Sequence, residues 1–266
     1  MQDSFSRDIA ITPNGEGAFT GFISPAWSQG RSAFGGLLTG QMLRSAEALI
    51  PLLPLRSVLV DFLAPAAQGP VQITAAVLRA GRSMSRVEVK LSQGQTHCAT
   101  LLAAYGPQRQ TALTHPPPPV PDTPEPEALT PMPWVEGEIP RFTRNFDYGY
   151  IDERFPFTGQ STPGVGGLVR LRDDAPVDAA AILALIDAWP SPGLPMLSRP
   201  APASTVTWMV NLPAGPCSAP PRSWWRFDAG LISSVDGFSD TEGRLWGPDG
   251  QLVATSRQLV AEFSRG

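Results

Sequence analysis

Alternating apolar and polar positions divide the sequence into two halves with the same order of elements. In the first half, residues 34–49 place apolar side chains at positions 38, 42, 46 and 49, the spacing of a helix that is buried on one side. A β-rich entry at residues 18–23 precedes this helix. Strand patterns follow at residues 57–63, 71–79, 85–91 and 97–105. The first half therefore predicts one helix and an antiparallel meander.

The second half repeats this order. Strand patterns at residues 141–150 and 167–172 precede a helical pattern at 178–189, which is apolar almost all round and ends before Pro190. Further strand patterns follow at residues 204–212, 224–232, 241–246 and 252–263. A helix that is apolar on every side needs cover on every side. We therefore expect an α+β fold of two tandem antiparallel sheets, each wrapped around a long central helix.

A proline-rich stretch separates the two halves at residues 107–140 and includes four consecutive prolines at 116–119. Proline donates no backbone hydrogen bond and fixes φ, so this stretch can form neither a helix nor a central strand. It is expected to run extended over a surface. The predicted organisation is a first domain at 1–106, a linker at 107–140 and a second domain at 141–266.

Composition narrows the class of protein. Because 42% of the residues are apolar and only 17% are charged, the chain can bury a full core. The net charge of −4 argues against a nucleic-acid partner, which would need a basic surface. No stretch approaches the roughly 18 apolar residues of a membrane span, and the N-terminus lacks the pattern of a secretory signal. We expect a cytoplasmic protein.

Several common chemistries have no support in the sequence. His97 lies in a strand pattern and His115 in the linker, so neither a histidine dyad nor a zinc site is expected. Cys98 and Cys217 are interpreted as buried free thiols. No Gly-x-Ser-x-Gly motif occurs, and no glycine run completes a dinucleotide or phosphate loop. We therefore predict no metal and no cofactor.

Two polar residues lie in segments that otherwise look buried. Asp187 is the only carboxylate in the apolar body of the second helix. If it is buried, it must be hydrogen-bonded or have a raised pKa; alternatively, it lies in the last turn and points into solvent. Gln258 sits in an alternating strand, where it either faces inward for a reason or lies on the surface. The residues alone leave both alternatives open.

Three blocks of sequence resemble the acyl-CoA thioesterase II family and its thioesterase-like relatives. They are residues 34–41 at the start of the first helix, residues 78–85 and residues 249–258. Their order and spacing fit this family from about residue 19 to residue 263. The resemblance implies a double hot-dog fold that hydrolyses fatty acyl-CoA, as part of lipid metabolism, without metal or cofactor.

The same resemblance implies a catalytic site. In the family, an aspartate on the second helix, a serine or threonine on the following strand and a glutamine on the last strand hold the attacking water. Asp187 and Gln258 match the first and third of these positions. Counting back from Pro213 places the hydroxyl at Ala203, so either Ser204 or Thr205 takes this role or the group is absent.

Helix N-termini offer free backbone N–H groups to a developing oxyanion, either at the first helix, which Gly35 and Gly36 open, or at the second; the sequence leaves both places open. The two glycines would also let substrate approach closely, although tight helix packing explains such a pair equally well. The first helix carries Glu47 as its only carboxylate. We therefore expect one working site per chain, in the second half.

Two alternatives to a thioesterase stay open. A hot-dog hydratase or dehydratase usually pairs aspartate with histidine, and neither histidine lies on or beside the second helix. A non-catalytic acyl-CoA-binding protein would carry a degenerate site, in line with the unassigned hydroxyl. In each case acyl-CoA is the expected ligand. The edges of a long sheet invite pairing, so a homodimer or larger homo-oligomer is expected.

Overall fold

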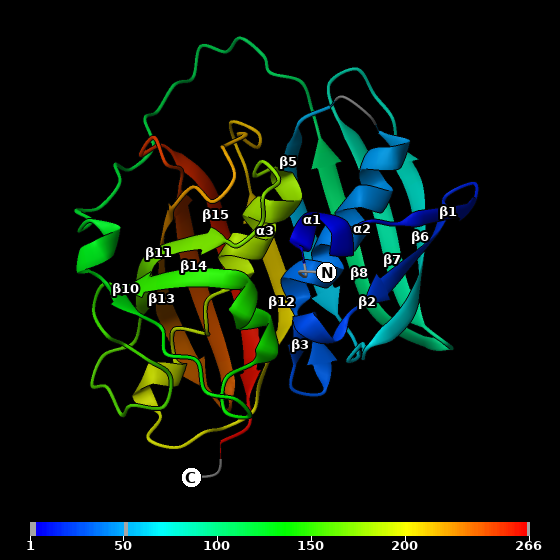
Figure 1. The fold of residues 1–266 in the computed structure, drawn as a ribbon. Coiled ribbons are helices and arrows are strands. Elements are labelled where there is room, and N and C mark those ends of the chain that lie inside the picture. The colour runs from blue at the N-terminus through cyan, green and yellow to red at the C-terminus, as the bar shows by residue number, and fades with distance from the viewer. Residues whose placement is uncertain (1–3, 51–52, 265–266) are drawn as a thin grey trace.

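The computed structural model describes residues 4–50 and 53–264, and within them thirteen strands form one antiparallel sheet (Figure 1). The order across this sheet is β1-β2-β6-β7-β8-β5-β12-β15-β14-β13-β11-β10-β9. Six strands that precede the linker, β1, β2 and β5–β8, form one side of this sheet, while β3 and β4 form a separate ribbon. The seven strands from β9 onward form the other side. Each half of the sequence therefore forms one continuous part of the sheet.

The first half wraps its strands around one long helix, α2 (Gly35–Leu49), which packs against β6, β7 and β8. A short helix, α1 (Phe5–Asp8), precedes it. The strands are β1 (Thr12–Gly15), β2 (Ala18–Ile23), β3 (Ser28–Gln29), β4 (Ser32–Ala33), β5 (Leu55–Phe62), β6 (Gly69–Arg79), β7 (Ser85–Gln93) and β8 (Thr96–Tyr105). The predicted helix and meander are both present.

The second half curls around α3 (Ala179–Asp187). Its strands are β9 (Thr130–Pro131), β10 (Phe146–Tyr150), β11 (Val165–Leu171), β12 (Ala203–Asn211), β13 (Trp225–Val235), β14 (Phe238–Trp246) and β15 (Leu252–Glu262). Short 3₁₀ helices lie at Pro25–Trp27, Pro126–Ala128, Arg141–Asn145 and Leu194–Met196.

The second central helix is shorter than the sequence pattern suggests, with nine residues against fifteen in α2. Its start is set by Asp178, whose side chain accepts a hydrogen bond from the Ala181 N–H at 3.1 Å, as an N-cap does. Its end is set by Pro190, which cannot continue a helix. Asp187 is therefore the final residue of α3.

The two predicted sheets are joined edge to edge into one. Strands β5 and β12 pair from Ser57↔Asn211 to Asp61↔Thr207. This pairing satisfies backbone groups that two separate sheets would leave exposed at their edges. The remaining edges of the described sheet are β1 and β9.

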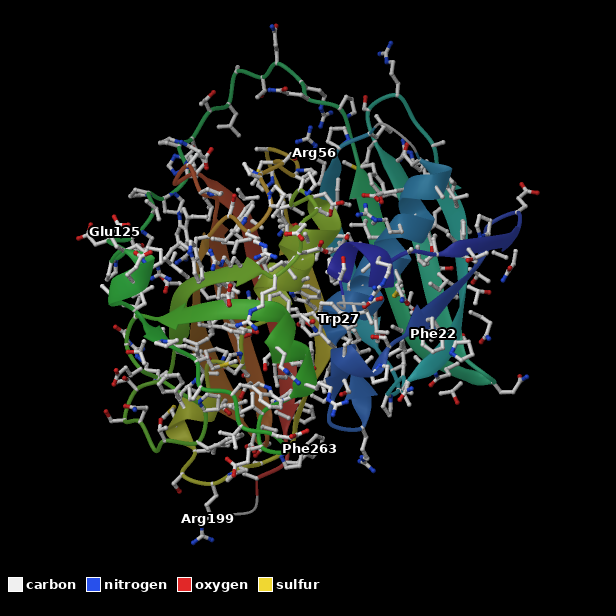
Figure 2. All side chains as sticks on the ribbon, in the orientation of Figure 1. Phe22, Trp27, Arg56, Glu125, Arg199 and Phe263 are labelled. Carbon is white, nitrogen blue, oxygen red and sulfur yellow. The ribbon has the colours of Figure 1, made fainter. Side chains whose placement is uncertain are left out.

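Aromatic side chains lock the two halves together. Trp27, which Figure 2 places near the centre of the molecule, stacks on Phe34 with ring centroids 6.0 Å apart. Phe34 in turn stacks on Phe142 of the second half at 4.3 Å, and Phe146 meets it edge-on at 5.8 Å. Burial of each such ring stabilises the fold by roughly 1.5–3 kcal/mol.

One predicted strand is wrong at its start. Residues 141–145, expected to open the strand at 141–150, form a 3₁₀ helix instead, and the strand begins at Phe146. The reason is packing, since this turn buries Phe142 and Thr143.

Within the linker, β9 pairs with β10 at the sheet edge, and the Pro118 carbonyl accepts a hydrogen bond from Trp246 Nε1 at 3.3 Å.

Candidate active site

The end of α3 meets the start of α2, because the two central helices run antiparallel. Oδ2 of Asp187 accepts a hydrogen bond from the Gly36 N–H at 2.7 Å. The first N–H groups of a helix have no partner inside the helix, and Phe34 at the N-cap of α2 offers no side-chain oxygen. Asp187 therefore caps, from the second half, the helix of the first half.

The two glycines make this contact possible in different ways. A Cβ atom on Gly35 would lie 2.8 Å from Asp187 Oδ2 and 3.2 Å from Cζ of Phe62. A Cβ atom on Gly36 would lie 2.5 Å from the Phe34 ring and 3.0 Å from the Cα of Ala184 in α3. Gly35 thus leaves room for the carboxylate, and Gly36 for close packing of the two helices.

The sequence offered both glycine N–H groups as donors to an oxyanion, but in the structure the two differ. The Gly36 N–H is engaged by Asp187, whereas the Gly35 N–H makes no hydrogen bond within the described chain. Of the pair, Gly35 is therefore the amide that is free to bind another acceptor.

Burial raises the pKa of Asp187 from an ordinary 3.8 to about 7, and the hydrogen bond from Gly36 offsets part of this rise. The residue retains a small accessible surface, so solvent reaches it while protein surrounds most of the carboxylate. Within the described residues no cation forms an ion pair with it. Asp187 is thus a stronger base than a surface aspartate and is about half ionised near pH 7.

The second polar group of the site joins β12 to β15. Thr205 Oγ1 donates a hydrogen bond to Gln258 Oε1 at 3.0 Å, and both side chains are partly buried. Ser204 is exposed and its side chain makes no hydrogen bond in the described structure. Of the two hydroxyls left open by the sequence, the structure brings Thr205 to Gln258.

A β-bulge explains why Thr205 faces inward. Thr205 pairs with Val260 and Thr207 with Leu259, so Val206 is an extra residue in β12. Val260 and Gln258 lie two positions apart and share a face, and Thr205 opposite Val260 joins them. Without the bulge, Thr205 would point with Thr207 to the opposite face.

The Asp187 contact and the Thr205–Gln258 pair are related through two adjacent strands, β5 and β12. Phe62, whose ring reaches Gly35, ends β5, and the adjacent Asp61 pairs with Thr207 of β12. The strand that carries Thr205 therefore lies beside the strand that ends at the Asp187 contact. No hydrogen bond joins Asp187 to Thr205 or Gln258 in the described part of the chain.

Trp208 is a residue of this site that the sequence did not single out. It pairs with Gln258 across β12 and β15, is fully buried, and donates from Nε1 to Ser256 Oγ at 2.9 Å. Its place follows from alternation only after the two strands are paired in register. Without that register, no pattern in the sequence identifies it.

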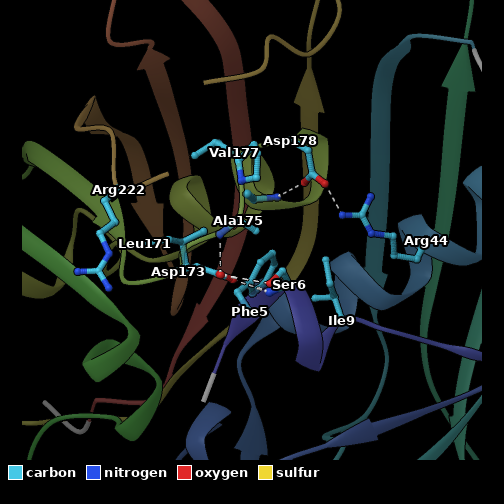
Figure 3. A pocket seen from close by; sticks show the side chains of 12 residues that line it. Phe5, Ser6, Ile9, Arg44, Leu171, Asp173, Ala175, Val177, Asp178 and Arg222 are labelled. Atoms are coloured by element: carbon cyan, nitrogen blue, oxygen red, sulfur yellow. Dashed lines mark hydrogen bonds and ion pairs between the residues drawn. The ribbon is translucent and has the colours of Figure 1, made fainter. Parts of the chain in front are cut away.

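Two hollows in the molecule lie elsewhere. One of about 30 Å³ lies where α1 meets the first turn of α3, at the far end of this helix from Asp187 (Figure 3). Arg44 bonds to Asp178 there, and Asp173 accepts a hydrogen bond from the Ser6 N–H at 2.6 Å. This volume suits one or two waters.

The other hollow, of about 230 Å³, lies over β11, β13 and β14. Three ion pairs line it: Arg154–Asp152, Arg226–Asp228 and Arg244–Glu242. Since each arginine is matched by an acid, the lining has no excess charge of either sign. Neither hollow is lined by Asp187, Thr205 or Gln258.

Three further observations concern metal ligands, His97 and membrane-spanning helices. Among the described residues, no group of three or more histidine, cysteine, aspartate or glutamate side chains is arranged to hold a metal ion. His97 contacts Thr100 and the Ala99 carbonyl on β8, away from α3. In the same part of the chain, no helix has the length and apolar character needed to span a bilayer.

Solved structures with the same architecture place the fold among the hot-dog proteins. A conserved protein of unknown function with a hot-dog fold from Alicyclobacillus acidocaldarius is 24% identical, with a TM-score of 0.88 and 100% of both chains covered. A candidate thioesterase II from Thermobifida fusca is 25% identical, with a TM-score of 0.83 over 98% of this chain and 97% of that one. An acyl-CoA thioesterase II from Mycobacterium marinum is 19% identical, with a TM-score of 0.78 over 99% of each chain.

Sequence models of a protein family give the same result. The acyl-CoA thioesterase N-terminal domain matches residues 23–106, and the acyl-CoA thioesterase C-terminal domain matches residues 126–261. No curated protein matches the sequence. The two domain matches cover most of the chain, follow its two halves and agree with its double hot-dog fold; the chain belongs to the acyl-CoA thioesterase family.

Proposed function

We propose that the protein hydrolyses fatty acyl-CoA thioesters to free acid and CoA, with Asp187 as the general base. The observation that carries this proposal is the carboxylate of Asp187, held at the N-terminus of α2 with its pKa raised to about 7. A base with a pKa near the operating pH is well matched to proton transfer from water. The family of the chain supplies the substrate class.

In the proposed reaction, the carboxylate of Asp187 takes a proton from water as the water oxygen attacks the thioester carbonyl carbon. The tetrahedral intermediate then collapses with cleavage of the C–S bond. The proton on Asp187 passes to the departing CoA sulfur, which regenerates the carboxylate. Since a thioester is already activated, this reaction needs no covalent intermediate on the protein.

Two groups are suited to orient the reacting atoms. Because Oε1 of Gln258 accepts from Thr205, its Nε2 is left to donate to the attacking water or to the substrate. The free N–H of Gly35, at the positive end of α2, would stabilise the oxyanion that forms on the thioester carbonyl. Both would act on charge that develops during the reaction.

The test is the release of free thiol from a panel of short-, medium- and long-chain acyl-CoAs. We expect turnover by the wild-type protein, a fall of about 10²–10⁴-fold in kcat for Asp187→Asn, and a fall of roughly 10–100-fold for Gln258→Ala. Asp174→Asn, which alters an exposed carboxylate, is the matched control and should retain full activity.

Full activity in both site variants would overturn the assignment of these residues. Tight binding of acyl-CoA by the wild-type protein without thiol release would instead favour a non-catalytic binding protein. Calorimetric titration with a non-hydrolysable thioether analogue of acyl-CoA measures that binding separately from turnover.

A further inference from the structure

The side chain of Gln258 lies between two fixed neighbours on the inner face of the sheet. Its register partner on β12 is Trp208. Its register partner on β14 is Thr241, whose Oγ1 donates a hydrogen bond to the backbone carbonyl of Gln258 at 3.4 Å. Opposed side chains in antiparallel strands have Cβ atoms about 5 Å apart, so both are in contact range. Their orientations limit where the amide of Gln258 can go.

The indole of Trp208 is tethered at one point. Its Nε1 donates to Oγ of Ser256 at 2.9 Å, and both residues are buried. Ser256 lies two residues before Gln258 on β15 and is the register partner of Val210. The tether therefore draws the indole along the strands toward the Val210–Ser256 pair, away from Thr205.

The orientation of the Trp208 indole restricts the direction in which the Gln258 side chain can extend. A glutamine on a strand can lean in either direction along it. The indole fills the space beside Ser256, so the direction that remains is toward Thr205. There Oε1 of Gln258 accepts the Thr205 hydroxyl. Trp208, tethered toward Ser256, and Thr205 therefore lie in opposite directions along the strands from Gln258.

We propose that Trp208, held by Ser256, is a positioning residue that fixes the amide of Gln258 for catalysis. The inference rests on the proposed function of Gln258. Trp208 acts through this amide and not on the substrate. When the tether is lost, the indole is free to move toward Gln258, and the amide spends less time in the orientation that directs Nε2 to the reacting atoms.

A purely structural role makes a different forecast. A buried Trp–Ser hydrogen bond contributes stability wherever it occurs, and its loss would lower the melting temperature without changing kcat of the folded enzyme. The control for this is Ser239→Ala, which removes another buried serine and its bond to Ser234 at 3.0 Å on the same sheet.

The experiment is a double-mutant cycle of Ser256→Ala and Gln258→Ala, with kcat and KM measured for acyl-CoA hydrolysis on folded protein. In the wild-type background we expect Ser256→Ala to lower kcat by roughly 5–20-fold, with KM changed less than about twofold. In the Gln258→Ala background the same change should have no further effect. Ser256→Thr, which keeps the hydroxyl, should restore most of kcat.

Ser239→Ala should lose stability with kcat unchanged. An equal loss of kcat from Ser256→Ala in both backgrounds, or no loss in either, would overturn the positioning role. If Ser256→Ala does not fold, Trp208→Phe takes its place in the cycle, because it removes the tether and keeps most of the apolar volume. Full activity of Gln258→Ala alone is a separate outcome, which overturns the assigned role of Gln258 and this inference with it.

Discussion

The carboxylate of Asp187, at the end of the second helix, accepts a hydrogen bond from the backbone N–H of Gly36, at the start of the first, over 2.7 Å. The proposed base and the amide that supports it therefore come from different halves of the chain. This hydrogen bond stabilises the charged form of Asp187, so it offsets part of the rise in pKa that burial causes. This contact has consequences that can be measured.

The first consequence concerns pH. As the proposed base, Asp187 has to be ionised to take a proton from water, and burial raises its pKa to about 7. We predict that kcat/KM falls about tenfold for each pH unit below 7 and levels off above it. Steady-state rates between pH 5 and 9, corrected for spontaneous hydrolysis, check this. A flat profile across this range would show that another group acts as the base.

The second consequence concerns stability. The folded-state pKa of Asp187 lies above its unfolded value, so its contribution to stability is fully present below about pH 4 and is lost as pH rises through about 7. By pH 8 this loss amounts to at most about 4 kcal/mol. Asp187→Asn removes the charge and should unfold at higher denaturant concentration than the wild type at pH 8, but not at pH 4.

Denaturant unfolding of both proteins at the two pH values measures this difference. The amide of the variant keeps an oxygen for the Gly36 N–H, so the comparison isolates the charge. A stability difference that does not change with pH would contradict the raised pKa. Together with lost turnover, a gain in stability at pH 8 would mark Asp187 as a residue kept for chemistry rather than for folding.

The third prediction concerns Gly35. A methyl group at this position would lie 2.8 Å from Asp187 Oδ2, so Gly35→Ala should displace the carboxylate, lower kcat and destabilise the fold by about 1–3 kcal/mol. Gly230→Ala is the control, because its added Cβ would meet no atom within 4 Å. Equal kcat and equal melting temperatures for the two variants would refute this account of Gly35.

The fourth prediction separates the two hydroxyls beside the bulge. Thr205→Val keeps the shape of the side chain but removes the donor to Gln258 Oε1, and kcat should fall about fivefold, the equivalent of one hydrogen bond of about 1 kcal/mol. Ser204→Ala, on the exposed face, should change neither kcat nor KM. The opposite ranking would assign the hydroxyl to Ser204.

Much of the fold could be predicted because its signals are local. The helix at 34–49 and the strands of both meanders follow from apolar spacing and turn residues, and the structure places them within a few residues of the prediction. The joining of β5 to β12 could not be foreseen in register, since it depends on two strands about 150 residues apart. The 3₁₀ turn at 141–145 depends on the aromatic cluster that buries Phe142.

The site was harder to predict than the fold for a related reason. Strict alternation along β12 cannot place Thr205, because Val206 is an insertion that only the pairing with β15 reveals. Likewise, the choice between a solvent-facing and a buried Asp187 depends on whether another helix meets it. Gly35 and Gly36 leave the space for that helix contact. In the sequence, however, this pair of glycines indicates close helix packing as readily as a binding site.

The Gly36–Asp187 contact also makes the two halves of the chain depend on each other. The first half provides the N-terminus of α2, where two glycines leave room, and the second half provides the carboxylate of Asp187 that binds there. Neither half forms this arrangement alone, because the donor lies in the first half and the acceptor in the second. Either half on its own would therefore lack this contact: the first would leave the start of α2 without its acceptor, and the second would leave Asp187 without its donor.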